Sequence, residues 1–166
     1  YSVFFYGDYA YLCCGFGVVL LDLVKFEIKD TYYIGVNGAN LQVNGMTCDG
    51  TYLYAATVSG ILRGKLDDPT LVDFRSWYTY VPADGLNIGN YSGVSFFNNF
   101  VYATRGDTLF KLENSIWSTD MVRNGYGIRK IEAGATKLVL SQIGSAGTRV
   151  MTINKEGVMD SVYSGQ

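Results

Sequence analysis

The sequence predicts an all-β protein, a β-propeller of four blades that each contain four antiparallel strands. Three observations lead to this class. A motif recurs at a spacing of roughly 40 residues, the length of a propeller blade. Tyr and Phe, which favour strands, number 14 and 9, whereas Pro occurs only 2 times in 166 residues. Helical periodicity is absent, and short apolar runs alternate with turns rich in Gly, Asn and Asp.

The motif occurs in four segments. Each segment contains one strand, a step of small residues and a second apolar strand. Gly17 of the first copy matches Gly60 of the second, and the Ala–Thr step after Tyr54 returns after Tyr102. The fourth copy is weaker. The segments are YLCCGFGVVLLDL (11–23), TYLYAATVSGILRGKL (51–66), FVYATRGDTLFKL (100–112) and TKLVLSQIGSAGTRVMTI (136–153).

Each copy divides into strands A to D. The Asp49-Gly50 pair supplies the positive φ that a tight A–B hairpin needs, and Gly60 closes the B–C turn. The four blades are expected at about 1–35, 45–80, 93–120 and 128–163. Their strands are expected at 3–6, within 11–23 and at 27–35; at 46–48, 51–57, 61–66 and 76–80; at 93–97, 100–104, 108–112 and 116–120; and at 128–132, 136–143, 148–153 and 158–163.

The strand at 51–57 is apolar or small on both faces, as expected for a blade covered by a neighbour on each side.

The copies run in phase from A to D, with no strand exchanged between the first and last blade. We therefore expect an arc of a larger ring whose open ends promote self-association. The predicted end-face residues are Val3, Phe5, Leu12 and Leu20 at one end and Leu138, Leu140, Val150 and Met151 at the other.

Cys13 and Cys14 align with Ala56 and Thr57, which are small-residue positions of strand B. Neighbours along a strand point to opposite faces, so the pair is badly placed to chelate one metal. Free cysteine is a common buried small hydrophobe, and we expect these two to serve packing. A disulfide from one of them to Cys48, and a metal or redox role, are the alternatives.

Composition excludes several classes of function. The chain contains 0 His, so it cannot build a Ser–His–Asp triad, a Cys–His pair or a His-ligated metal site. No pair of carboxylates stands out, so we predict no enzyme, no metal and no cofactor. The scattered charges and the net charge of -2 argue against nucleic acid. The uncharged run at 9–21 is too short for a membrane-spanning helix.

The B–C turns and the D-to-A connections must lie at one end of the ring, and the longest loops gather there. Long loops on a rigid scaffold are where binding concentrates. The D-to-A connections contain several asparagines that could bind glycans or, as the alternative, serve as ordinary turn formers: Asn37, Asn40, Asn44, Asn87 and Asn90. Trp77 and Trp117 occupy equivalent D strands, where they serve blade packing or, alternatively, stack on sugar. The candidate binding residues are Phe16, Asn37, Asn40, Ser59, Asn87, Asn90, Arg105 and Asp107.

Two segments carry a family resemblance. GDYAYLCCGFGVVLLDLVKFEIKDTYYIGVNGANLQVNG (7–45) and ATVSGILRGKLDDPTLVDFRSW (56–77) resemble the amino-terminal propeller of PorZ-type proteins of Bacteroidetes. The specific phrases are EIKDTYYIG-NG and the AT-SGI to DF-RSW stretch; Cys13-Cys14 departs from the small polar residues expected there. The resemblance implies a ring of about seven blades, of which these four are an arc.

The resemblance also implies a function. PorZ-type proteins are non-catalytic components of the cell surface, and they are associated with type IX secretion and with attachment of cargo to anionic lipopolysaccharide. Partners would be other surface-complex proteins or a glycan. The main alternative is the periplasmic propeller of a hybrid two-component regulator that binds oligosaccharide. A propeller hydrolase or lyase is the third reading. Fold alone does not decide among them.

Overall fold

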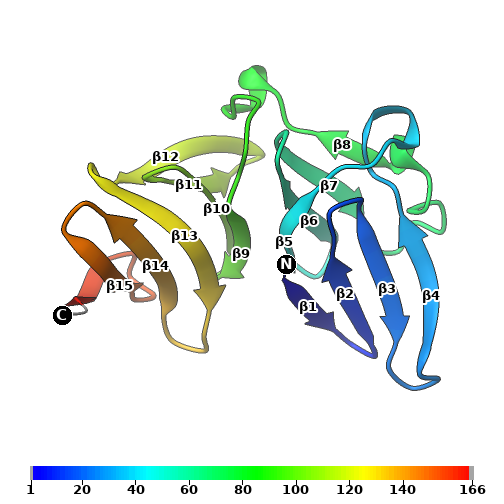
Figure 1. Ribbon diagram of the computed structural model, residues 1–166, viewed down its shortest axis with the longest axis horizontal. Helices are drawn as coiled ribbons and strands as arrows, with labels where there is room; N and C mark the ends of the chain where they lie inside the picture. The colour runs from blue at the N-terminus through cyan, green and yellow to red at the C-terminus, as the bar shows by residue number, and fades with distance from the viewer. Residues whose placement is uncertain (1, 165–166) are drawn as a thin grey trace.

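The computed structural model describes residues 2–164 and contains four separate antiparallel sheets, each built from four consecutive strands (Figure 1). Blade 1 comprises β1 (Val3–Tyr6), β2 (Tyr9–Cys13), β3 (Val18–Asp22) and β4 (Glu27–Tyr32). Blade 2 comprises β5 (Val43–Cys48), β6 (Tyr52–Thr57), β7 (Ile61–Lys65) and β8 (Trp77–Thr79). Blade 3 comprises β9 (Gly93–Phe97), β10 (Phe100–Arg105), β11 (Thr108–Glu113) and β12 (Ile116–Val122). Blade 4 comprises β13 (Tyr126–Ala133), β14 (Leu138–Gly144), β15 (Gly147–Ile153) and β16 (Met159–Ser164).

Tight turns close the blades, and the all-β class is confirmed. Asn98 and Asn99 both adopt positive φ, 50° and 66°, as a two-residue hairpin turn with the twist of its strands requires. The Asn114–Ser115 turn between β11 and β12 has the same pair of angles. Within residues 2–164, helix is limited to three 3₁₀ turns, η1 (Val36–Gly38), η2 (Phe74–Ser76) and η3 (Pro82–Asp84).

Three buried apolar clusters join consecutive blades. The first lies between blades 1 and 2 around Tyr32 and Trp77, and the second lies between blades 2 and 3 around Tyr80 and Trp117. The third joins blades 3 and 4 around Leu109. The interior blades 2 and 3 are therefore covered on both faces, which explains why their B strands lack polar alternation. This packing confirms the propeller architecture.

The two tryptophans repeat one packing role. Trp77 lies with its ring centre 6.2 Å from that of Tyr32, at the end of the preceding blade's outer strand. Trp117 meets Tyr80 in the same way one blade later, edge-on at 5.6 Å. Both indoles are buried, at 6% and 2% exposure. They are blade-packing residues and are not placed to stack on sugar.

The first blade presents an uncovered apolar face. Val3 and Phe5 are 51% and 65% exposed, and Leu12 is half-buried. The prediction for Leu20 is wrong, because Leu20 is buried in the cluster between blades 1 and 2. Leu12 pairs with Val19 in the ladder, so Val19, not Leu20, shares its face.

The prediction of the end-face residues of blade 4 is also wrong for three of its four residues. Leu138, Leu140 and Met151 are fully buried against blade 3, whereas Val150 lies on the other face and is 38% exposed. Contacts between blades follow the order 1–2–3–4, with β1 and β2 on β5, β5 and β6 on β9, and β9 and β10 on β13. Figure 1 shows blades 1 and 2 on one side and blades 3 and 4 on the other, with β5 and β9 between them. Self-association through the end faces remains a prediction.

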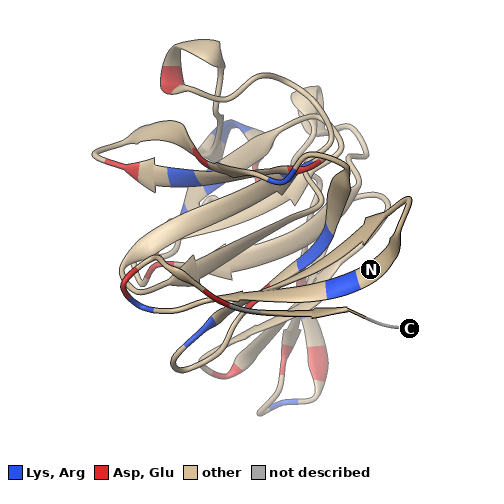
Figure 2. Cartoon of the chain, turned by 90° about the vertical axis from the view of Figure 1, so that its left-hand side faces the viewer, with Lys and Arg blue, Asp and Glu red and all other residues tan. Residues whose placement is uncertain are grey.

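The three cysteines are free thiols, so the disulfide alternative is wrong. Cys13 is 1% exposed and lies in the cluster between blades 1 and 2, as its alignment with Ala56 predicts. Burial raises the pKa of Cys13 to about 12, which keeps the thiol protonated and unreactive. Within the described part of the chain no helix is long and apolar enough to cross a membrane. Lys and Arg are interspersed with Asp and Glu (Figure 2).

Candidate functional site

The A strands of the four blades surround a cavity along the axis of the arc. Its inner part, about 310 Å³, is lined by β1, β5, β9 and β13. It widens to a cavity of about 510 Å³ at the end where the D-to-A connections enter the A strands. We call this wider part the axial mouth. Its lining residues are Ser2, Gln42, Val43, Asn44, Asn90, Ser92, Arg129 and Lys130.

Two β-bulges at equivalent positions shape the axial mouth. Asn44 is skipped in the ladder between β5 and β6, where the pairing moves from Val43 to Gly45. Arg129 is skipped in the same way between β13 and β14. A bulge inserts an unpaired residue and re-aims its side chain, and bulges are frequent next to functional sites. The two skipped residues both line the mouth, one with an amide and one with a guanidinium.

A row of amides crosses the mouth from blade 2 toward blade 3. Gln42 Nε2 donates to Asn44 Oδ1 at 2.9 Å. Asn44 Nδ2 donates to Asn90 Oδ1 at 2.8 Å and to the Tyr91 carbonyl at 2.7 Å. The row fixes Asn44 and leaves the Asn90 amide nitrogen without a hydrogen-bond partner in residues 2–164. It therefore presents an oriented donor to the mouth.

Positive charge lies beside the amides. Arg129 is exposed and forms no ion pair with any described residue, whereas Lys130 pairs with Glu132 at 3.0 Å. An unpaired guanidinium offers a planar fork of donors that matches a carboxylate or phosphate group. The mouth can therefore hold an anionic group through Arg129 and an adjacent hydroxyl through Asn90.

The structure joins three of the predicted residues between blades 2 and 3. Arg105 Nη1 donates to the Asn87 carbonyl at 3.4 Å, and its guanidinium lies 5.8 Å from the ring centre of Tyr91. The Ser59 carbonyl accepts from Gly89 N at 3.4 Å. Burial raises the pKa of the Tyr91 hydroxyl, and Arg105 opposes that rise.

The other predicted residues lie apart from this group. The Phe16 carbonyl accepts from Leu41 N at 3.3 Å, and Asn37 sits in η1 with a φ of 57°, which makes it a turn residue. Asn40 is exposed, and the Asp107 carbonyl accepts from Arg123 N at 2.9 Å. Of the eight predicted residues, only Asn90 lines the mouth. A binding role for the eight remains a prediction.

Sequence reasoning missed Arg129 and Lys130 as mouth residues, because both fall inside a segment expected to be a regular strand. A bulge adds one residue to a strand without changing its apolar pattern strongly, so no signal in 128–132 reveals it. Among the described residues no group of three or more Cys, Asp or Glu is placed to hold a metal ion.

Comparison with protein families supports the predicted resemblance. Residues 1–78 match the family model of the PorZ N-terminal β-propeller domain of the type IX secretion system. The match covers the segments that carry the resemblance in the sequence, so the resemblance is confirmed for residues 1–78. A search of curated protein sequences found no match.

Solved structures share the fold at low sequence identity. PorZ of Porphyromonas gingivalis, described as an essential surface component of the type IX secretion system, superposes with a TM-score of 0.63 at 15% identity over 96% of this chain and 25% of its own. The extracellular domain of the putative hybrid two-component system BT4673 from B. thetaiotaomicron gives 0.73 at 10% identity over 100% of this chain and 22% of its own. A chain of the nidogen/laminin complex gives 0.65 at 13% identity, covering 95% and 64%. The chain thus spans about a quarter of the length of the first two proteins.

Proposed function

We propose that this chain is part of a non-catalytic recognition propeller of the PorZ type, exported to the cell surface, that binds an anionic glycan at the axial mouth. The observation that carries this proposal is the pair of equivalent bulges that bring Asn44 and Arg129 to the mouth. The ligand class is an acidic polysaccharide such as anionic lipopolysaccharide. In the whole protein the propeller would serve attachment of cargo at the surface as one component of a larger complex.

Two features support an anionic ligand at the mouth. Arg129 lacks a carboxylate partner among the described residues, so it can form charge-assisted hydrogen bonds with a ligand. The amide row beside it is held by hydrogen bonds of 2.7–2.9 Å, so little conformational entropy is lost on binding. The family match to the PorZ propeller supports the surface role.

The likeness to BT4673 favours a second candidate, a periplasmic sensor propeller that binds a neutral oligosaccharide. The charge of the ligand distinguishes the two functions. An anionic glycan that contacts Arg129 must bind more weakly as ionic strength rises, whereas a neutral oligosaccharide must not.

The test is calorimetric titration of the chain with purified anionic lipopolysaccharide at low and high salt. Arg129→Ala should weaken binding about tenfold or more and reduce its salt dependence, since a hydrogen bond to a charged group contributes about 1.5–3 kcal/mol. Arg75→Ala is the matched control, because Arg75 is exposed in the C–D connection of blade 2, does not line the mouth and pairs with Asp73.

Unchanged affinity in Arg129→Ala, or equal losses in the Arg129 and Arg75 variants, would refute the proposed site. Salt-independent binding of a neutral oligosaccharide that requires Asn90 would favour the sensor function instead.

A further inference from the structure

A groove of about 580 Å³ lies between blades 1 and 2, at the end of the propeller where the A–B and C–D turns lie. This is the end opposite the axial mouth. One wall is the outer part of blade 1, and the other is the connection between β7 and β8. The lining residues that matter here are Tyr6, Asp8, Tyr9, Tyr11, Asp30 and Tyr32.

Two tyrosines of the groove have buried rings and hydroxyls that contact no protein partner in the described part of the chain. Tyr11 and Tyr32 are 4% and 5% exposed, and neither hydroxyl has a hydrogen-bond partner among residues 2–164. Tyr54 is the equivalent of Tyr11 in blade 2, and its hydroxyl donates to Asp49 Oδ2 at 2.8 Å. Neither hydroxyl is among the fully buried unpartnered atoms of the described residues, so both oxygens are open to the groove and are available to a ligand.

Both hydroxyls remain protonated donors at neutral pH. Burial raises the pKa of Tyr11 to about 12 and also raises the pKa of Tyr32, and each phenol is further disfavoured as an anion by a neighbouring tyrosine. A partner must therefore accept hydrogen bonds from them.

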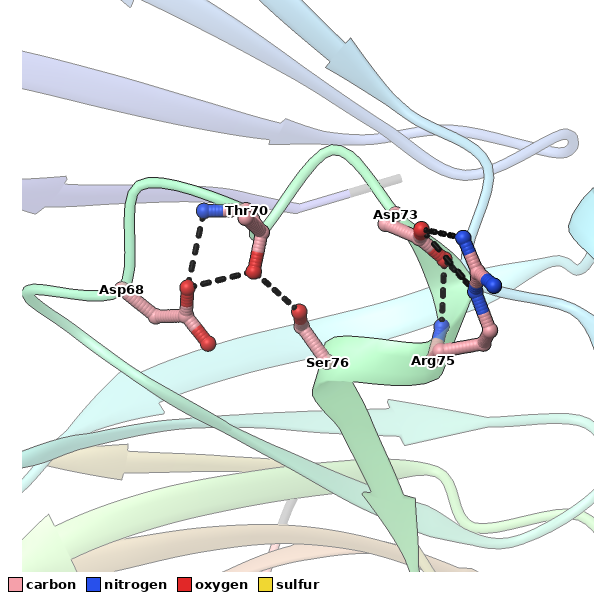
Figure 3. A network of polar contacts seen from close by, with 5 residues as sticks. All are labelled: Asp68, Thr70, Asp73, Arg75 and Ser76. Carbon is pink, nitrogen blue, oxygen red and sulfur yellow. Dashed lines mark hydrogen bonds and ion pairs between the residues drawn. The ribbon is translucent and has the colours of Figure 1, made fainter.

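The far wall of the groove is held in place by side-chain contacts within one connection (Figure 3). Asp68 Oδ1 accepts from Thr70 N at 2.8 Å, and Thr70 Oγ1 lies 2.7 Å from Ser76 Oγ. The Trp77 indole donates to the Leu71 carbonyl at 2.9 Å and anchors the same connection to the core. The groove is thus formed before any ligand arrives, as in most small-molecule sites.

The charge of the groove excludes an acidic ligand. Four carboxylates line it, Asp8, Asp30, Asp67 and Asp68, against one lining ammonium, that of Lys29, and Asp67 also pairs with Lys65 at 3.1 Å. Clefts lined by one sign of charge repel ligands of the same sign. An amine would satisfy the carboxylates, but it would offer no acceptor to the tyrosine hydroxyls. A neutral polyhydroxyl ligand donates to carboxylates and accepts from phenols.

We propose that this groove binds a short neutral saccharide, with the Tyr11 and Tyr32 hydroxyls donating to its oxygens and Asp30 accepting from its hydroxyls. The site is separate from the axial mouth and differs from it in ligand charge. Failure of one proposal therefore leaves the other unaffected.

The test is calorimetric titration of the chain with four neutral disaccharides, maltose, cellobiose, lactose and chitobiose, and with the anionic digalacturonate. At least one neutral sugar should bind, and digalacturonate should not. Tyr11→Phe and Tyr32→Phe keep the ring and remove one donor, so each should weaken the binding roughly five- to tenfold. Both variants should remain folded, since each keeps the buried ring and removes a hydroxyl that contacts no protein partner among the described residues.

Tyr102→Phe is the matched control. Tyr102 is the equivalent of Tyr11 in blade 3, is 5% exposed, and lies outside the groove. Its variant should bind as the unmodified chain does. The proposal is overturned if none of the four neutral sugars binds, if digalacturonate binds as tightly, or if the Tyr102 variant loses as much affinity as the Tyr11 variant.

Discussion

The two repeat-equivalent tryptophans should respond unequally to the same substitution. Trp77 Nε1 donates to the Leu71 carbonyl at 2.9 Å, whereas Trp117 Nε1 is buried without a partner in the described residues. Replacement by Phe removes the same atoms from two similar inter-blade packings, so the cavity costs nearly cancel in the comparison. The two variants then differ mainly in one hydrogen bond.

The magnitude follows from that bond. Trp77→Phe loses a hydrogen bond with a net contribution of about 1 kcal/mol and leaves a buried carbonyl unpaired, at a cost of about 1–3 kcal/mol. Trp117→Phe instead removes an unsatisfied donor. We therefore expect Trp77→Phe to lower the free energy of unfolding by about 2 kcal/mol more than Trp117→Phe.

Urea denaturation followed by far-UV circular dichroism measures this difference. With an m-value of about 2 kcal/mol/M, the two midpoints should differ by about 1 M. Equal midpoints, or a lower midpoint for Trp117→Phe, would show that the indole hydrogen bond does not govern this packing.

Three further expectations concern the glycine turns, alkaline pH and the cysteines. Gly17→Ala should lower the free energy of unfolding by about 3 kcal/mol, because the new Cβ would lie 2.0 Å from a carbonyl oxygen at a φ of 150°. Gly60→Ala, at a φ of 153°, places its Cβ near no backbone atom within 4 Å and should lower it by about 1 kcal/mol. Urea midpoints in the reverse order would contradict this. Burial raises the pKa values of Cys13 and Tyr11 from 9.0 and 10.0 to about 12, so their contribution to stability is complete below pH 9 and is lost as pH rises toward 12; a flat melting temperature over that range would contradict it. The double variant Cys13→Ala with Cys14→Ser should fold normally and keep ligand binding, and loss of binding with an intact fold would disprove the packing role.

The blades could be predicted from the sequence because turns and repeats are local. Asp49-Gly50 and Asn98-Asn99 mark hairpins by the backbone angles they tolerate, and the alignment of Gly17 with Gly60 sets the phase of the copies. These signals need no knowledge of distant contacts.

The orientation of the end faces could not be predicted in the same way. The run Val18 to Leu21 is apolar at every position, so alternation does not reveal which side faces blade 2. That choice depends on the register with β2, which pairs Leu12 with Val19. This ambiguity explains why Leu20 was wrongly predicted to lie on the open end face. The same ambiguity explains the wrong predictions for Leu138, Leu140 and Met151 in blade 4.

The candidate site was predictable only in part. The end of the ring that holds the site could be predicted from strand direction, and Asn44 and Asn90 were identified among the loop asparagines. The bulges at Asn44 and Arg129 were not, because they depend on how two strands pair and not on which residues favour strands.

The three clusters between four blades make residues 2–164 a linear array of four units, in which each unit packs against its sequence neighbours. Stability in such an array is a sum over units and their interfaces. Blades 2 and 3 have two interfaces each, and blades 1 and 4 have one in the described residues. Opening of blade 4 therefore breaks only the cluster around Leu109, whereas opening of blade 2 breaks two. When residues 1–166 are studied alone, backbone amides in β14 and β15 should consequently exchange with solvent earlier than those in β6 and β10.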